Sequence, residues 1–206
     1  MPCDMSEWEN ALSIFNQFVF ADSIERDEKL LMAEEAMRIG RERGREIRKE
    51  FPDISVQEIL RCQGVSIHEE GQDRGWGQDY VKFAEFHVKQ NRILLNREAL
   101  HRIGRHMDIN TAREIILGHE LYHLFECRRW GDTSAGFVRT VKLFGVIPVK
   151  RRMLPVSEIA AGSFTKELLA LNQGKLKNSI LSDKPNLCFS RKSGFCNTRI
   201  ECILRA

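Results

Sequence analysis

Residues 118–126 read GHELYHLFE and lie inside an apolar segment with helical periodicity. The stretch contains the pattern H-E-x-x-H, in which His119 and His123 are four residues apart. On a helix, residues with this spacing lie one above the other on the same face, so both imidazoles can offer a ring nitrogen to one tetrahedral Zn²⁺. Glu120 lies about 100° further round the helix, where its carboxylate can reach a water beside the metal without binding the metal. The pattern is typical of a zinc hydrolase with the glutamate as general base; the alternative is a chance match on a core helix.

A catalytic zinc usually has three protein ligands and one open position. The metzincin pattern would place a glycine and a histidine three and six residues after His123, but Glu126 and Arg129 stand there. Cys127 shares the helical face, but it lies one turn, roughly 5.4 Å, too far along. Asp132 follows the helix and would need a tight reversal of the chain.

Glu158 is the better candidate for the third ligand. It stands at the start of a later predicted helix, where a carboxylate is favoured by the helix dipole. Ala161, Gly162 and Thr165 on the same face are small, so this helix can approach the motif helix closely. The alternative is that Glu158 is only an N-terminal charge on a surface helix.

Composition sets the limits of the interpretation. With 206 residues and 42% hydrophobic residues, the chain is long enough for one domain with a sizeable core. The net charge of +3 is too small to indicate nucleic-acid binding by itself. Apolar runs are far shorter than the ~20 residues of a membrane span, and the N-terminus does not resemble a signal peptide. We therefore expect a cytoplasmic protein with no membrane association.

The six cysteines form no C-x-x-C pair, and without an export signal we expect reduced thiols. Cys188, Cys196 and Cys202 gather near the C-terminus, where a second metal site is an alternative, although their spacing matches no common zinc ribbon.

Periodicity and capping signals predict the elements around the motif. Helices are expected over 6–20, 25–50, 56–62, 97–106, from Thr111 (with Glu114 as a capping box) to about Gly131, and over 158–171 after a Ser157 cap. Strands are expected over 65–67, 81–88 and 92–96. The mixed-sign run 41–46 is expected to be a solvated helix face, and 131–156 a long connection that could cover a substrate.

The expected fold class is therefore α+β. A small three-stranded, mostly antiparallel sheet would pack on the motif helix and the following helix, preceded by N-terminal helices. The expected organisation is an N-terminal helical extension (1–24), a main domain (25–173) and a basic C-terminal appendage (174–206).

Two segments together resemble a known family. IILGHELYHL at 115–124, followed by Glu158-x-x-Ala161-x-x-Phe164-x-x-x-Leu168-Leu169, is similar to the ImmA/IrrE-type zinc metallopeptidases. GVSI at 64–67 and RILLN at 92–96 also fit. Two positions depart from the family pattern, because Thr165 stands where alanine is usual and Ala170 where proline is usual.

The resemblance implies a zincin-like domain that holds Zn²⁺ through His119, His123 and Glu158. It also implies a regulatory peptidase whose protein or peptide substrate is a transcriptional repressor or an antitoxin-like partner. The substrate would lie extended along an edge strand of the sheet. Candidates for stabilising the oxyanion are Tyr80, His101, His106 and Tyr122.

Two other functions stay open. One is a non-catalytic, zinc-containing interaction module of a stress-response or toxin–antitoxin system, although Glu120 has no purpose in a purely structural site. The other is nucleic-acid binding through the basic tail and Lys150-Arg151-Arg152, which the small net charge disfavours.

Overall fold

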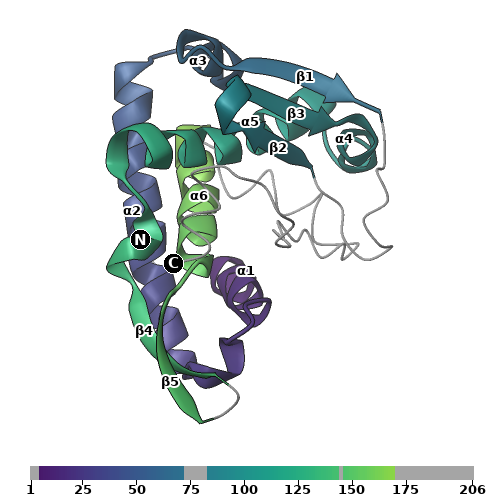
Figure 1. The fold of residues 1–206 in the computed structure, drawn as a ribbon. Helices are drawn as coiled ribbons and strands as arrows, with labels where there is room; N and C mark the ends of the chain where they lie inside the picture. Colours follow the sequence, from purple (N-terminus) through teal and green to yellow (C-terminus); the bar gives the residue numbers. More distant parts are fainter. Residues whose placement is uncertain (1–4, 72–82, 144–145, 170–206) are drawn as a thin grey trace.

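The computed structural model describes residues 5–71, 83–143 and 146–169 and has an α+β fold, as expected (Figure 1). The α-helices are α1 (Met5–Asn16), α2 (Arg26–Glu50), α3 (Val56–Cys62), α4 (Arg97–Ile103), α5 (Ile109–Phe125) and α6 (Pro155–Leu168). The strands are β1 (Ser66–Glu70), β2 (Ala84–His87), β3 (Arg92–Asn96), β4 (Val138–Leu143) and β5 (Ile147–Arg152). Short 3₁₀ turns occupy Ala21–Ser23, Val88–Gln90 and Thr133–Gly136, and a π-helical turn, Glu126–Trp130, follows α5.

The three-stranded sheet has the order β1-β3-β2, and the expectation of a mostly antiparallel sheet was wrong. A tight turn that ends at Asn91, with φ of 47°, joins β2 to β3 and makes this pair antiparallel. β3 returns between β2 and β1 and runs parallel to β1, with Ile67 opposite Ile93. β3 is therefore the central strand of the sheet, although it comes last of the three in the sequence. The order of the strands along the chain does not reveal their order in the sheet.

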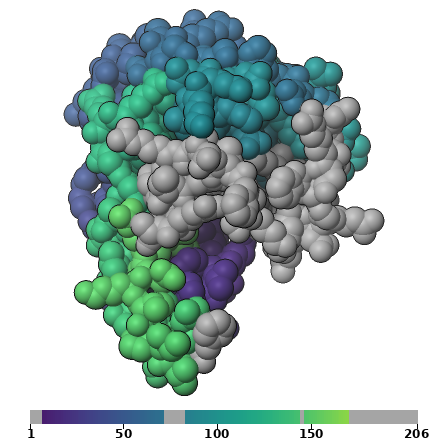
Figure 2. All heavy atoms as spheres, viewed as in Figure 1, coloured from purple at the N-terminus to yellow at the C-terminus, as the bar shows by residue number. Residues whose placement is uncertain are grey.

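The segment 131–156 was expected to be a long connection, but it contains regular secondary structure. Its residues form a second, two-stranded antiparallel sheet, β4–β5, in which Val141 faces Val149. An ion pair between Arg139 and Glu28 ties this hairpin to α2. In the space-filling view, the hairpin and the three-stranded sheet lie at opposite ends of the molecule (Figure 2). The hairpin therefore contacts α2 and lies far from the three-stranded sheet.

Helices α2 and α6 lie side by side along most of their length (Figure 1). A Cβ atom at Gly40 would lie 2.2 Å from the carbonyl oxygen of Ala160, and one at Gly44 would lie 2.9 Å from that of Phe164. Only glycine permits so close an approach. The run 41–46 was expected to be solvated, but it has Gly44 buried against α6 and Arg43 directed into the protein.

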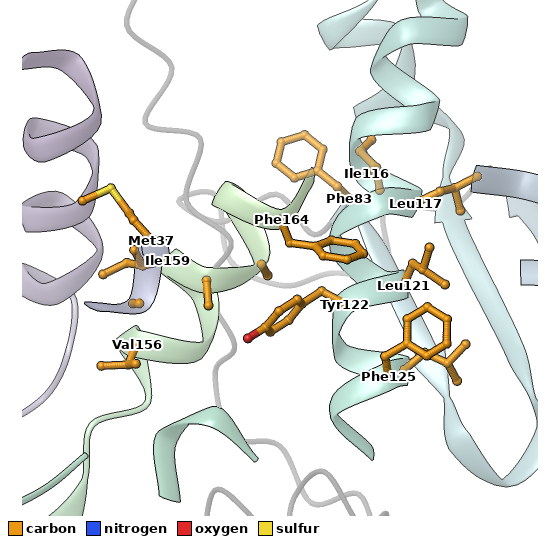
Figure 3. Packing of buried hydrophobic residues seen from close by; sticks show 14 of the residues in the cluster. Met37, Phe83, Ile116, Leu117, Leu121, Tyr122, Phe125, Val156, Ile159 and Phe164 are labelled. Atoms are coloured by element: carbon orange, nitrogen blue, oxygen red, sulfur yellow. The ribbon is translucent and has the colours of Figure 1, made fainter. Parts of the chain in front are cut away.

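The hydrophobic core fills the space between α2, α6 and α5 and continues to the sheet (Figure 3). Met37 of α2, Phe164 of α6 and Leu121 of α5 are each no more than 2% exposed. Within the described ranges, no helix has the length and apolar character needed to cross a membrane. In the motif helix α5, residues 116–125, which form its middle and C-terminal turns, are all buried.

Candidate metal centre

Helix α5 carries the H-E-x-x-H pattern, and it begins at a different residue from the one expected. Asp108 is the N-cap, because its carboxylate accepts hydrogen bonds from the backbone N–H of Thr111 at 2.8 Å and from its hydroxyl at 3.0 Å. These bonds lower the pKa of Asp108. Glu114, expected to complete a capping box with Thr111, instead accepts from the backbone N–H of Val56 and caps α3. The two helices are thereby fixed to each other.

Helix α6 begins three residues earlier than expected, with Pro155 in its first turn. Glu158 still lies in that first turn. The predicted close approach to α5 occurs at Thr165, whose Cγ2 would lie 2.9 Å from a Cβ atom at Gly118. Gly162 plays no part in it, because a Cβ atom there would have no neighbour within 4 Å. The small residue pair Gly118–Thr165 therefore brings the two helices together next to His119.

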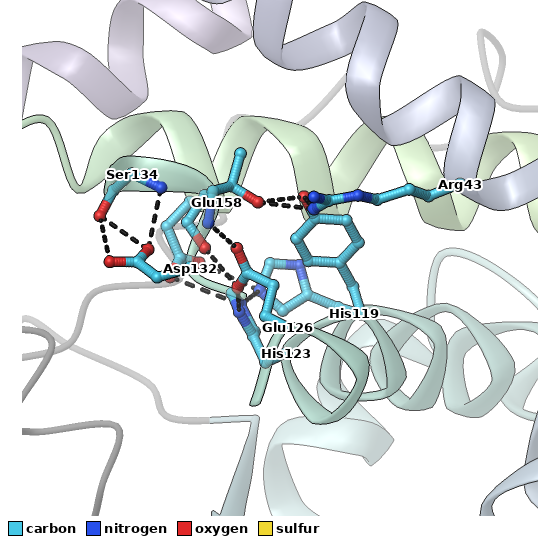
Figure 4. Close-up of polar contacts among 10 residues, drawn as sticks. Arg43, His119, His123, Glu126, Asp132, Ser134 and Glu158 are labelled. Atoms are coloured by element: carbon cyan, nitrogen blue, oxygen red, sulfur yellow. Dashed lines mark hydrogen bonds and ion pairs between the residues drawn. The ribbon is translucent and has the colours of Figure 1, made fainter. Parts of the chain in front are cut away.

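His119, His123 and Glu158 converge at the α5–α6 contact (Figure 4). The two Nε2 atoms are 3.1 Å apart. Nε2 of His119 is 3.0 Å from one carboxylate oxygen of Glu158, and Nε2 of His123 is 3.6 Å from the other. Their side chains are 7%, 4% and 19% exposed, respectively. The structure thus brings together the three residues that the sequence analysis selected.

This spacing fits a metal ion. Zn–N and Zn–O bonds of about 2.0–2.1 Å in a tetrahedron place neighbouring ligand atoms roughly 3.3–3.4 Å apart. The two Nε2 atoms are 3.1 Å apart and Nε2 of His119 is 3.0 Å from Oε2 of Glu158, both close to that value, and Nε2 of His123 is 3.6 Å from the other oxygen, Oε1. Two imidazoles and one carboxylate are also a donor set found in catalytic zinc sites. The three residues can therefore hold a divalent cation and leave a further coordination position.

The ionisation of Glu158 suits this role. Burial by itself raises the pKa of the carboxyl group, but the neighbouring His123 and His119 outweigh burial and hold the pKa well below its ordinary value. The group is therefore an anion at neutral pH, as a ligand must be.

Glu120, the expected general base, lies between the two histidines in the sequence and is 9% exposed. Within the described residues, its carboxylate has no hydrogen bond or ion pair. No other described side chain therefore engages this carboxylate, which belongs to the residue directly after the ligand His119 on α5.

Glu126 was not recognised from the sequence as part of the site. Its Oε2 lies 2.8 Å from Nδ1 of His123 and accepts a bond from the Ser157 hydroxyl at 2.7 Å. Its Oε1 accepts from the backbone N–H of Thr133 at 2.9 Å. Burial raises the pKa of Glu126, but the bonds from His123, Thr133 and Ser157 outweigh burial and lower it. The i,i+3 spacing from His123 was the signal that could have revealed it.

Arg43 was also missed, and it contacts Tyr122, one of the candidates for stabilising the oxyanion. The Arg43 guanidinium donates to the Tyr122 hydroxyl at 2.6 Å and to the Thr133 hydroxyl at 2.7 Å, and lies 4.8 Å from the centre of the Trp130 ring. Burial raises the pKa of Tyr122, which is fully buried. Because its hydroxyl is held by Arg43 and Thr133, Tyr122 supports the fold around the site.

The remaining candidates within the described part of the chain do not join the three ligands. The Asp132 carboxylate accepts from Ser134 and from Arg152, so it caps the following turn. Cys127 is half-buried and outside the ligand group. His101 and His106 are exposed. Tyr80, Cys188, Cys196 and Cys202 and the appendage 174–206 lie outside the described residues.

The only His/Cys/Asp/Glu group that can hold a metal among the residues with described structure is therefore His119, His123 and Glu158. No family model, curated protein or solved structure matches this chain.

Proposed function

We propose that the protein is a metal-dependent peptidase, with His119, His123 and Glu158 as ligands and Glu120 as general base. The observation that carries the proposal is the convergence of one ligand atom each from His119, His123 and Glu158, all within 4.8 Å of one another, on a helix that also carries Glu120, whose carboxylate has no hydrogen bond or ion pair within the described residues. Zinc is the proposed metal, because a His₂Glu set with an open position suits it. When bound, it would supply Lewis-acid chemistry that polarises the scissile carbonyl and acidifies a water.

The residues of the chain perform the proton transfers. The Glu120 carboxylate accepts the proton of the attacking water, and then passes that proton to the amine nitrogen as the peptide bond breaks. Since a proton is taken up and given back, Glu120 ends the cycle ionised. His119, His123 and Glu158 remain fixed throughout by α5 and α6.

The sheet offers a place for an extended substrate. Among the described strands, β2 is an edge strand, because β3 pairs with β2 on one side and with β1 on the other. β2 also contacts α5, the helix that carries the histidines. We propose that a peptide adds to this edge of β2 by backbone hydrogen bonds and so lies near α5. This supports a peptide or protein as the substrate class.

The resemblance to the ImmA/IrrE-type metallopeptidases extends the proposal to biology. It supports a regulatory protease, located in the cytoplasm, whose substrate is a DNA-binding repressor or an antitoxin-like protein. The competing proposal, a non-catalytic zinc-containing interaction module, uses the same three ligands but gives Glu120 no task.

The exchange Glu120→Gln separates the two. We expect the zinc-loaded wild type to cleave members of an unstructured peptide library, as followed by mass spectrometry. Glu120→Gln should keep its zinc and its fold but lose about 10²–10⁴-fold in rate, the usual contribution of a general base. Glu98→Gln makes the same chemical change at an exposed residue of α4 and should leave cleavage unchanged.

Equal cleavage by wild type and Glu120→Gln would contradict the role of Glu120 as general base. A zinc-loaded wild type that cleaves no peptide in the library would favour the interaction module.

A further inference from the structure

Glu126 touches both ligand-bearing helices without belonging to the ligand group. It lies at the C-terminal end of α5, is 6% exposed, and is bonded to His123 on its own helix and to Ser157 on α6. Ser157 directly precedes the ligand Glu158. One buried carboxylate therefore connects a ligand of α5 to the backbone neighbour of a ligand on α6.

We propose that Glu126 is a positioning residue for the metal centre. It holds the His123 ring with the proton on Nδ1, so that the lone pair of Nε2 faces the other two ligands. This inference rests on the proposed function, because it concerns the metal ligands of that site.

The direction of the bonds follows from the partners. The backbone N–H of Thr133 can only donate, and the Ser157 hydroxyl donates to the same carboxylate. Both oxygens of Glu126 thus act as acceptors, and we assign the donor role across the 2.8 Å contact to Nδ1 of His123. A neutral imidazole with its proton on Nδ1 has an unprotonated Nε2, which is the form that binds a metal.

The geometry on the other side of the ring agrees with this assignment. Nε2 of His123 lies 3.1 Å from Nε2 of His119 and 3.6 Å from Glu158. The lone pair freed by the Glu126 contact therefore points toward the remaining ligand atoms. A carboxylate that served only to end α5 would have no need to bond the ligand ring.

Glu126→Gln tests the proposal while preserving the shape of the side chain. The amide oxygen has to face the Thr133 N–H, because the backbone group cannot accept. The amide NH₂ then faces Ser157 and Nδ1 of His123, so Nδ1 becomes an acceptor and the ring proton moves to Nε2. A protonated Nε2 cannot bind the metal, and we expect zinc affinity to fall about 10- to 100-fold, as for loss of other residues that orient a ligand.

Ser157→Ala is the matched control. It removes one hydrogen bond to Glu126 but leaves the contact between Glu126 and His123 intact. We expect its zinc affinity to stay within about 3-fold of wild type, well below the effect of losing a ligand-orienting residue. Equal weakening by Glu126→Gln and Ser157→Ala would show that Glu126 acts by holding α6 rather than by orienting His123, and would overturn the proposal. So would a Glu126→Gln protein that binds zinc as well as wild type.

A second measurement does not depend on metal binding or on the Glu126→Gln protein. The ¹⁵N chemical shifts of the ring nitrogens in the metal-free wild type, with His123 assigned by comparison with His123→Gln, report which nitrogen carries a proton. A proton on Nδ1 of His123 supports the proposal, and a bare Nδ1 with a proton on Nε2 overturns it. If the wild type bound no zinc, the proposed function would fail, and these shifts would still decide the role of Glu126.

Discussion

Helix α6 has two buried contacts of opposite character. Toward α2 it presents backbone, and Gly40 and Gly44 let the two helices approach so closely that a single methyl group would overlap a carbonyl oxygen. Toward α5 it presents Glu158, whose carboxylate meets two imidazoles. The α2–α6 contact is stabilised by close packing. The α5–α6 contact brings electron-rich ligand atoms together, an arrangement that a bound cation would stabilise. We infer that packing against α2 fixes the position of α6, and that α6 in this position places the third ligand, Glu158, next to the histidines of α5.

The largest effect is expected at the packed contact. Gly40→Ala places a Cβ atom 2.2 Å from the Ala160 carbonyl oxygen and 2.9 Å from the Phe164 nitrogen, so the helices must separate. We expect a loss of about 3 kcal/mol of unfolding free energy or more, at the upper end of overpacking costs. Urea denaturation provides the measurement.

Gly162→Ala is the control on the other side of α6, where a Cβ atom meets nothing within 4 Å. Because alanine favours a helix interior, this change should stabilise the protein by about 0.5–1 kcal/mol. Equal destabilisation by the two exchanges would contradict the role given to the α2–α6 contact.

A smaller effect is expected at Arg43, which connects α2 with the α5 side of the site. Arg43→Met keeps much of the apolar volume but removes the bonds to Tyr122 and Thr133 and the contact with the Trp130 ring. We expect a loss of about 1.5–3 kcal/mol, typical of hydrogen bonds to a charged group. Arg43→Lys should recover only part of this, since it lacks the planar fork. If Arg43→Met were as stable as wild type, α2 would act on the site through packing alone.

The smallest effect is expected at Asp108, at the end of α5 far along the helix from the ligands. Asp108→Ala removes the N-cap and should lower the unfolding temperature slightly while zinc affinity stays unchanged. The pKa of Asp108 is lowered in the folded protein, so its charge stabilises the fold above its ordinary value of 3.8. This contribution is lost as the pH falls through the lowered pKa, and the charge-dependent part of the difference between variant and wild type should vanish there. A pH-independent difference in thermal denaturation would contradict this explanation.

The parts of the site that were predictable from the sequence are those set by local spacing. His119 and His123 follow from a four-residue interval on one helix, and Glu158 from its place in the first turn of a helix with small residues. The α2–α6 contact was missed because Gly40 and Gly44 stand among charged residues that indicate a solvated face. Their four-residue spacing on one helical face was the available signal.

Contacts between distant segments could not be predicted in the same way. Arg43 meets Tyr122 and Thr133 across 79 and 90 residues of sequence. The parallel pairing of β1 with β3 depends on which side of β2 the chain returns, and strand patterns do not encode that choice. Asp108 and Thr111 are both favourable N-cap residues, and only the three-dimensional structure distinguishes them.

The most direct test of the central claim is the metal content of purified protein after dialysis against zinc, measured with the variants His119→Ala and Glu158→Ala. We predict about one tightly held zinc per chain, since three protein ligands with an open position bind one ion. His119→Ala should lose it, and Glu158→Ala should bind it much more weakly. Wild-type protein without zinc, or zinc retained equally by both variants, would contradict the assignment of His119, His123 and Glu158 as a metal centre.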